Sequence, residues 1–262
     1  MTEEPLLLER RDGVVRLTLN RPARLNCVDR ELNRRLREAL EGLAGDPGVR
    51  AVVLSGRGRA FCTGQDLRER HADLQQGTPD LGAALSGGFN RIVGAIRALE
   101  VPVVAAVNGI AAGAGANLAL ACDLVLAARS ARFVQSFAEV GLLPDSGGTW
   151  SLPRLVGEAR ARGLALLAEP LDAARAEQWG LIWRCVDDDA LEDATAALLA
   201  TLLAKPRATL AAIKAALAAS PGHGLAAQLE LEAALQSGLG RAPDYRAAVE
   251  HFVAARAAKE PR

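Results

Sequence analysis

The stretch at residues 101–123, VPVVAAVNGIAAGAGANLALACD, constrains the fold more than any other part of this chain. The short apolar run at 103–107 predicts a buried strand, and Asn108-Gly109 predicts a turn. A run of small residues follows at 113–116, before an apolar helix predicted over 117–121. A turn rich in Gly and Ala leaves backbone N–H groups uncovered, and the helix start adds partial positive charge. Such a place stabilises an anion, either a phosphate or an oxyanion formed during a reaction.

A second site of the same kind lies earlier in the chain. Residues 51–54 predict a short buried strand, and the loop SGRGRAFCTG at 55–64 follows it and leads into a helix near 65–67. Ligands of α/β folds bind at the carboxyl ends of strands, where Thr63-Gly64 presents another bare amide. The alternative is an ordinary loop that uses Gly for its positive φ.

The remaining segments alternate between strand and helix signals. Asp12-Gly13 predicts a hairpin turn between two strands, and Asp29 predicts the N-cap of a helix over 30–42. The polar, Gly-rich residues 71–90 predict a mobile segment or lid edge. The turn at 144–149 leads into a helix, with Asp145 placed as its cap. Further elements are predicted as helices at 89–99, 154–167, 172–180 and 245–258 and as strands at 124–127, 132–134 and 181–186.

This pattern predicts an α/β body at residues 1–190 and a helical C-terminal region at 191–262. Lys plus Arg and Asp plus Glu both total 31, so the balance of charge favours no nucleic-acid partner. The four scattered cysteines form no C-x-x-C pair, which argues against a metal cluster or disulfide framework and favours a reducing cytoplasm. The first residues do not resemble a signal peptide, and no apolar run reaches the ~20 residues that span a bilayer.

Several kinds of chemistry are disfavoured by the positions of the residues that would carry them. The three histidines, His71, His223 and His251, lie outside both Gly-rich sites, which disfavours a Ser-His-Asp triad or a zinc site. Gly113 and Gly115 follow a strand as a dinucleotide fingerprint would, but position 118 is Leu instead of the third Gly.

Four motifs together resemble the crotonase (enoyl-CoA hydratase/isomerase) superfamily: RPARLNCVD, GRGRAFCTGQDL, PVVAAVNGIAAGAGANLALACDLVLAARSARFVQ and LPDSGGTWSLPRLVG. The resemblance implies a crotonase-like spiral of ββα units with a C-terminal helical trimerisation region. It also implies an acyl-CoA thioester substrate, a homotrimer or a dimer of trimers, no metal, and no cofactor beyond the coenzyme A of the substrate. By position, the amides of Thr63 and Ala114 would form an oxyanion hole for the thioester carbonyl.

The proton-transfer residues decide the subclass. Hydratases of this superfamily use two glutamates, and those positions here match Asn117 and Phe137, neither of which is an acid or a base. One carboxylate remains in the motif LPDSGGTW, Asp145, and a single carboxylate suits isomerisation. Its alternative role is that of a simple N-cap. Glu139 is a second candidate base, in a different register, for which a surface role is favoured.

Within the superfamily, GAGANLALACDLVLAARSARF, GLLPDSGGTWSLPRLVG and AEQWGLIWRCVDD most resemble the isomerases of ring-1,2-epoxyphenylacetyl-CoA. The resemblance places the substrate's CoA moiety near Arg24 and Leu25 and along Gly64, Gln65, Asp66 and Leu67, with Asn117 and Phe137 beside the acyl group. Arg24 would pair with a CoA phosphate or remain a solvated surface residue. Two alternatives stay open: a Δ3-Δ2-enoyl-CoA isomerase or hydratase of aliphatic chains, and a non-catalytic acyl-CoA-binding protein.

Overall fold

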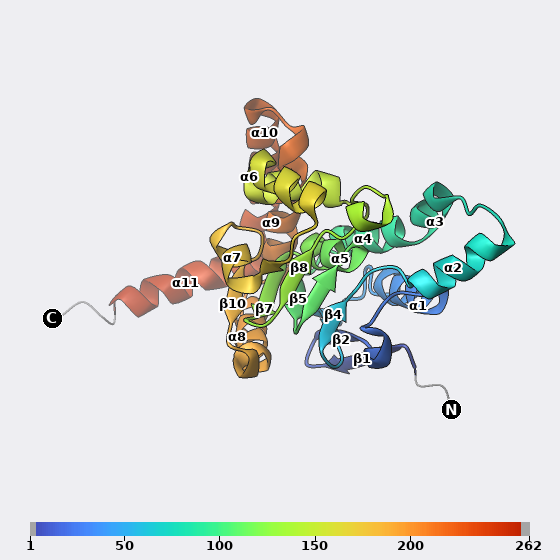
Figure 1. Ribbon diagram of the computed structural model, residues 1–262. Coiled ribbons are helices and arrows are strands. Elements are labelled where there is room, and N and C mark those ends of the chain that lie inside the picture. The colour runs from blue at the N-terminus through green and yellow to red at the C-terminus, as the bar shows by residue number, and fades with distance from the viewer. Residues whose placement is uncertain (1–3, 258–262) are drawn as a thin grey trace. The chain divides into compact units, whose positions relative to one another are not determined.

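The computed structural model describes residues 4–257, which divide into two compact units between Leu202 and Leu203 (Figure 1). The strands all belong to the first unit: β1 (Leu6–Arg11), β2 (Val14–Leu19), β3 (Ala51–Gly56), β4 (Ala60–Cys62), β5 (Val103–Val107), β6 (Ile110–Ala112), β7 (Leu124–Ala128), β8 (Arg132–Val134), β9 (Leu171–Asp172) and β10 (Arg184–Val186). The helices that begin in this unit are α1 (Arg30–Glu41), α2 (Leu67–Gln76), α3 (Leu81–Gly87), α4 (Phe89–Ala98), α5 (Ala114–Ala121), α6 (Gly148–Leu167), α7 (Ala173–Gln178) and α8 (Leu191–Leu203).

Two sheets organise the first unit. The larger has the order β1-β2-β3-β5-β7-β10 and is parallel except for the β1–β2 hairpin. The smaller has the order β4-β6-β8-β9, in which β4, β6 and β8 are parallel. The fold is therefore the mixed α/β arrangement with parallel sheets that the sequence predicts.

The central strands of the larger sheet are buried on both faces. In β3, Val52 and Leu54 join the main core, whereas Ala51 and Val53 pack in a second cluster with Leu199 of α8. Strands covered on both faces read as uninterrupted apolar runs, which explains why residues 51–54 and 103–107 carry no alternating pattern.

Helix α1 shows how local sequence signals place an element against the core. The Asp29 side chain accepts a hydrogen bond from the Leu32 amide at 2.8 Å, which caps the helix at the predicted residue. Leu32, Leu36 and Leu40 recur every four residues and are all buried. The apolar stripe therefore faces the core, and α1 packs on α4.

Several predicted boundaries are wrong. The 55–64 loop contains β4, and β6 lies between the predicted strand and helix, so α5 begins at Ala114 instead of residue 117. Residues 71–90, predicted as a mobile segment or lid edge, contain the end of α2 and all of α3, which project to the right in Figure 1. The strand predicted over 181–186 is confined to Arg184–Val186. The last helix begins at Pro243, ahead of Asp244, and its predicted end at residue 258 lies outside the described residues.

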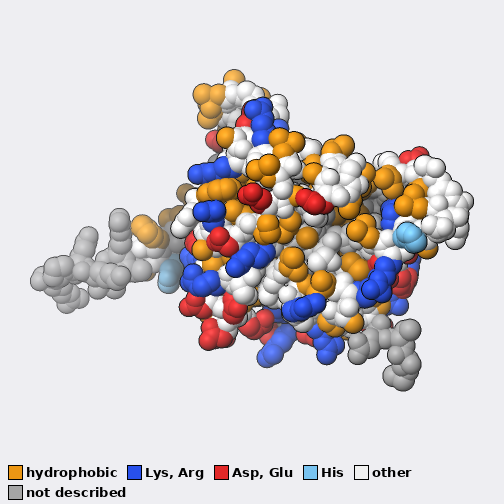
Figure 2. Space-filling model, in the orientation of Figure 1, with side chains coloured by type: hydrophobic (Ala, Val, Ile, Leu, Met, Phe, Trp, Pro, Cys, Tyr) orange, Lys and Arg blue, Asp and Glu red, His pale blue; other side chains and the backbone are white. Residues whose placement is uncertain are grey.

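The second unit consists of helices α9 (Arg207–Ala219), α10 (Leu225–Gly240) and α11 (Pro243–Ala257). Large apolar side chains of these helices are exposed in the single chain: Ile213, Leu217, Leu225, Leu229, Tyr245, Val249, Phe252 and Val253. Short 3-10 turns occur at Pro22–Arg24, Ala138–Val140, Asp188–Ala190 and Ser220–Gly222. On the face shown in Figure 2, positive and negative side chains of the described residues are interspersed.

The packing of α1 generates a stability prediction. Leu36 is 0% exposed in the main core, so Leu36→Ala should lower the free energy of unfolding by about 2–5 kcal/mol through lost burial and a residual cavity. Leu8 on β1 is 45% exposed, and Leu8→Ala should stay within about 0.5 kcal/mol of the parent. Chemical denaturation of both variants tests this, and equal losses would contradict the assignment of α1 to the core.

Candidate functional site

The two Gly-rich loops meet in the structure. Strands β4 and β6 are parallel neighbours, with Cys62 paired to Ala111, so the loops that follow them leave the same edge of the sheet. Gly64 has φ +80°, and a Cβ atom placed there would lie 3.1 Å from the backbone nitrogen of Ala114. The Thr63-Gly64 loop therefore contacts the first residue of α5, which is a juxtaposition that the residues alone did not predict.

The amides of this contact have no competing acceptor. Among the described residues, no group accepts a hydrogen bond from the amide of Thr63 or Ala114, whereas the Gly113 amide donates to the Val134 carbonyl at 2.8 Å. Ala114 is the first residue of an entirely buried helix. Because the first amides of a helix are unpaired and its dipole is positive there, this position can stabilise an anion.

Asp145 does not cap the helix that follows it, so that prediction is wrong. Ser146 and Gly147 both have positive φ, at 51° and 80°, and Gly147 is the N-cap of α6. The Asp145 side chain instead accepts a hydrogen bond from Ser146 Oγ at 2.7 Å. Burial raises the pKa of the Asp145 carboxyl above its ordinary value, and the Ser146 hydrogen bond opposes this only in part. Such a group is a stronger base than an exposed aspartate.

Asn117 and Phe137 both lie near the start of α5. Asn117 is fully buried within α5, and its amide nitrogen donates to the Asp145 backbone carbonyl at 2.8 Å. Phe137 is 6% exposed, and its ring lies 3.9 Å from where a Cβ of Gly113 would be. Glu139, in contrast, is exposed on a short 3-10 turn. The structure thus leaves Asp145 as the carboxylate beside Asn117.

An apolar cavity of about 300 Å³ opens at Asp145. The cavity is lined by residues from the start of α2, from α3 and α4, and from the segment before α6. These residues are Gln65, Leu67, Arg70, Leu81, Ala84, Leu85, Phe89, Leu142, Leu143 and Asp145. Gln65 and Leu67 thus line the same cavity as the predicted base. A carboxylate facing a mainly hydrophobic cavity suits an acyl group whose carbon atoms exchange protons.

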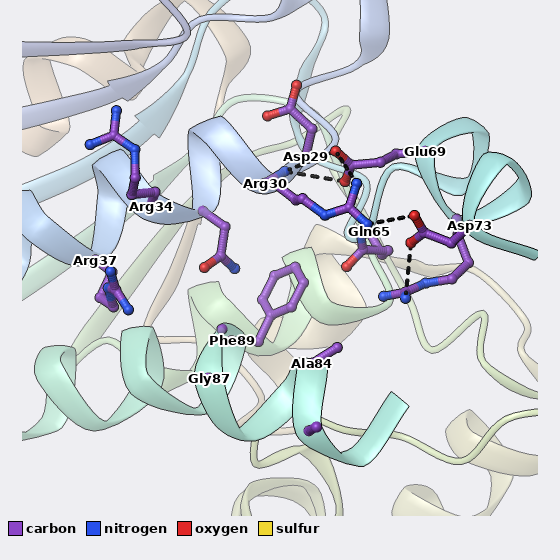
Figure 3. A pocket seen from close by; sticks show the side chains of 14 residues that line it. Asp29, Arg30, Arg34, Arg37, Gln65, Glu69, Asp73, Ala84, Gly87 and Phe89 are labelled. Carbon is purple, nitrogen blue, oxygen red and sulfur yellow. Dashed lines mark hydrogen bonds and ion pairs between the residues drawn. The ribbon is translucent and has the colours of Figure 1, made fainter. Parts of the chain in front are cut away.

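A second, charged pocket lies next to the first (Figure 3). The two share the lining residues Gln65, Arg70, Ala84 and Phe89. Arg30 forms ion pairs with Glu69 at 3.3 Å and Asp73 at 2.5 Å across this pocket. Its walls come from α1, α2, α3 and α4, and Figure 3 shows the Phe89 ring between the charged side chains and the helix below.

The loop that carries Arg24 and Leu25 is fastened to the start of α2. Asp66 is 4% exposed, accepts hydrogen bonds from Arg24 at 2.9 Å and Arg21 at 3.1 Å, and caps α2 through the Arg68 amide. Burial raises the pKa of Asp66, but hydrogen bonds from Cys27, Arg21 and the Arg68 amide outweigh it and keep that pKa below its ordinary value. Asp66 therefore holds the loop by ion pairing.

Leu25 contributes its backbone to the same contact. It has φ +50°, and its carbonyl accepts a hydrogen bond from Thr63 Oγ1 at 3.3 Å. Arg24 and Leu25 thus lie against the Thr63 loop, although binding of CoA by Arg24 stays a prediction.

Sequence reasoning missed three groups around Asp145. Ser146 donates to its carboxylate, Gln135 donates to Asn117, and Gly148 packs on Asn117. Ser146 and Gly148 were signalled by their place in the PDSGGTW motif. Gln135 carried no signal, because its partner is 18 residues away in the sequence.

Neither a metal cluster nor a membrane-spanning helix is found in the described part of the chain. Within residues 4–257, no three His, Cys, Asp or Glu side chains are grouped to hold a metal ion. No single described helix is long and apolar enough to cross a bilayer, and only the bent pair at 188–203 and 207–222 meets those criteria together.

Two amides without acceptors, at Thr63 and at the start of α5, and one half-buried carboxylate at the edge of an apolar cavity are groups suited to enolate chemistry. The family model for enoyl-CoA hydratase/isomerase matches residues 9–259. The chain is 47% identical to 1,2-epoxyphenylacetyl-CoA isomerase of Escherichia coli K12 over 93% of each chain. It is 34% identical to 2,3-dehydroadipyl-CoA hydratase of the same organism over 95% of each.

A solved enoyl-CoA hydratase from Mycobacterium smegmatis matches with a TM-score of 0.90 and 35% identity over 97% of each chain. The protein therefore belongs to the enoyl-CoA hydratase/isomerase family, the crotonase superfamily, whose members act on CoA thioesters, as its motifs predict.

The environment of Asp145 generates a pH-dependent stability prediction. Because burial raises its folded-state pKa, the ionised carboxylate destabilises the fold above that pKa. Asp145→Asn removes the charge and keeps an acceptor for Ser146, so the variant should unfold at a higher temperature than the parent at pH 7–8. The difference should shrink below about pH 4, where the aspartate is protonated in both folded and unfolded states.

Thermal unfolding at several pH values measures this difference. Asp12, whose side chain is 84% exposed, is the matched control, since Asp12→Asn should produce no such pH-dependent gain. A variant at 145 that is less stable than the parent throughout would show that ionised Asp145 is not destabilised by burial.

Proposed function

We propose that the protein is an acyl-CoA isomerase that forms a thioester enolate at the Thr63–Ala114 contact and moves a proton with Asp145. The observation that carries this proposal is that α5 joins the parts of the site, because its first residue contacts the Thr63 loop and its Asn117 binds the segment of Asp145. Positions 117 and 137 hold Asn and Phe, so neither supplies a second carboxylate. Addition of water to a double bond needs both a proton donor and an activator of water, so a single carboxylate favours isomerisation.

The reaction begins with the thioester oxygen between the amides of Thr63 and Ala114. Asp145 takes a proton from carbon, and the electron pair of that C–H bond passes to the thioester oxygen as an enolate. The amides stabilise the negative charge, which is worth about 3–4 kcal/mol for each donor. When the enolate collapses, its electron pair returns to carbon and Asp145 gives the proton back at another carbon. With the epoxide substrate, the C–C bond shared by the three-membered and six-membered rings also breaks, which gives the seven-membered oxepin with the same atoms as the substrate.

The proposed physiological substrate is 2-(1,2-epoxy-1,2-dihydrophenyl)acetyl-CoA, with an oxepin-CoA as the product. The E. coli isomerase of that name supports this proposal, as do the mainly hydrophobic lining of the cavity at Asp145 and the apolar Phe137. A Δ3-Δ2-enoyl-CoA isomerase uses the same proton shuttle, so turnover of linear 3-enoyl-CoA is the alternative activity. The hydratase names among the relatives keep hydration as a competing outcome of the same assay.

The CoA moiety is proposed to extend from the Thr63 loop past Arg24, Leu25 and Gln65. Coenzyme A is part of the substrate, and the proposed steps use no other cofactor. The homotrimer or dimer of trimers stays a prediction for the helical C-terminal region, to which the exposed apolar residues of α9, α10 and α11 are suited.

Asp145→Asn should lower the rate of isomerisation by about 10²–10⁴-fold, because the amide cannot take the proton. Acyl-CoA affinity should stay within about three-fold, since binding in the ground state does not use the proton transfer. Liquid chromatography separates the isomeric products of epoxyphenylacetyl-CoA, 3-enoyl-CoA and 2-enoyl-CoA and measures the first effect, while mass spectrometry of the same fractions detects any addition of water. Calorimetric titration measures the second effect.

Glu139→Gln is the matched control and should retain the parental rate, because Glu139 is exposed away from the cavity lining. Parental turnover by the Asp145 variant would refute its role. Binding of acyl-CoA without turnover of any of the three thioesters by the parent would support the non-catalytic alternative.

Ala114→Pro tests the oxyanion amide directly. Ala114 is the first residue of α5, a position where proline fits a helix and removes only its N–H. Loss of that donor should lower kcat by about 10²–10³-fold while the fold is kept. Leu225→Pro makes the same change at the first residue of α10 and should leave kcat unchanged. Circular dichroism confirms folding, and an active Ala114 variant would place the anion elsewhere.

A further inference from the structure

The segment that carries Asp145 is held by a chain of buried side-chain amides. Gln135 Nε2 donates to Asn117 Oδ1 at 2.9 Å, and Asn117 Nδ2 donates to the Asp145 backbone carbonyl at 2.8 Å. Both amides are at least 97% buried. The Gly148 amide donates to the same carbonyl at 2.8 Å, so this oxygen accepts from both α5 and the start of α6.

The orientation of each amide is forced by its neighbour. The Asp145 carbonyl can only accept, so the nearer atom of Asn117 must be its NH₂ group. Asn117 Oδ1 then faces Gln135, whose NH₂ group must point back toward it. Gln135 Oε1 is left buried without a partner among the described residues. Every hydrogen bond in this series therefore donates toward Asp145, and the series ends at Gln135 Oε1.

Close packing fixes Asn117 as well. A Cβ atom at position 148 would lie 2.4 Å from Asn117 Nδ2, so glycine there lets the amide reach the Asp145 carbonyl. A glutamate at 117 would be one methylene longer and, when ionised, would have no hydrogen to donate. The site is therefore built for a donor of asparagine's length.

We infer that Asn117 is a positioning residue: its amide fixes the backbone at Asp145 and thereby aims the carboxylate into the cavity. This inference rests on the proposed function, in which Asp145 is the base. The Ser146–Gly147 turn that follows has positive φ at both residues, so the peptide that carries the base is not fixed by a regular helix or strand. Asn117 supplies that constraint from α5, one turn after Ala114.

The test uses Asn117→Asp, which keeps the shape and makes the donor dependent on pH. When protonated, the introduced carboxyl can donate to the Asp145 carbonyl. When ionised, it cannot donate, and it repels both that oxygen and the Asp145 carboxylate. The other titratable groups to consider are Asp145 itself and Cys62, which packs on Gly115 and whose pKa burial raises to about 12, so it stays neutral.

The parental kcat should rise with pH as Asp145 ionises and then stay level. In Asn117→Asp, kcat should fall again at alkaline pH by about ten-fold, the effect of one lost buried hydrogen bond, with KM within about three-fold. Gln135→Glu is the second variant, to be used if Asn117→Asp does not fold. The introduced carboxyl can donate to Asn117 Oδ1 only when it is protonated, so kcat should again fall at alkaline pH.

The matched control is Asn20→Asp, at another buried asparagine whose amide donates to a backbone carbonyl, that of Glu4 at 2.8 Å. It should lose stability and keep the parental pH profile. A uniform loss of kcat at all pH values in Asn117→Asp, or a parental profile, would overturn the inference. If Asp145→Asn is inactive in that case, the proposed base stands; if Asp145→Asn is active, the proposed function itself fails.

Discussion

The contact between α5 and the end of β4 is the constraint on which the site depends. A Cβ atom on Gly115 would lie 2.3 Å from the Cys62 carbonyl oxygen, so the helix and strand can touch only if residue 115 has no side chain. Gly64 is also close to this helix, because a Cβ atom there would lie 3.1 Å from the backbone nitrogen of Ala114. These two contacts hold the loop that carries Thr63 against the first turn of α5. The small residues of this segment are needed for close packing, because a larger side chain at these positions would clash.

Rigidity around this contact comes from burial on every side. All residues of α5 are buried, and β5, one of the strands on which it packs, is covered on both faces. A helix with so little exposed surface has no room to shift, so the positions of its first amides are set by the core. By contrast, the cavity beside Asp145 includes exposed side chains of Leu67, Leu142 and Leu143, which leaves its shape open to the acyl group.

The sequence predicted those elements whose signals are local. The buried strand at 103–107 and the helix capped by Asp29 both follow from nearby residues. Nearby glycines also predicted uncovered amides in both loops, whereas the choice of Ala114 came from the family resemblance. Strands β4 and β6 were missed because these short strands lie among the glycines that predict loops and turns, Gly58 and Gly64 around β4 and Gly109 and Gly113 around β6. The contact between the two loops arises because β4 pairs with β6. Asp145 is held by Asn117, which lies 28 residues earlier in the chain. Both contacts join residues far apart in the sequence, so no local pattern of residues predicts them.

The amide at position 117 also decides which chemistry the site can support electrostatically. Two carboxylates held close together raise one another's pKa, so that one stays protonated and can serve as an acid while the other serves as a base. Asp145 has no such partner at 117, and desolvation is the main cause that raises its pKa. A lone carboxylate alternates between its two protonation states within one turnover, and each proton it takes must be returned to the same substrate. The neutral Asn117 thus binds the Asp145 backbone without adding a second titratable proton to the site, which favours the proposed isomerisation over hydration.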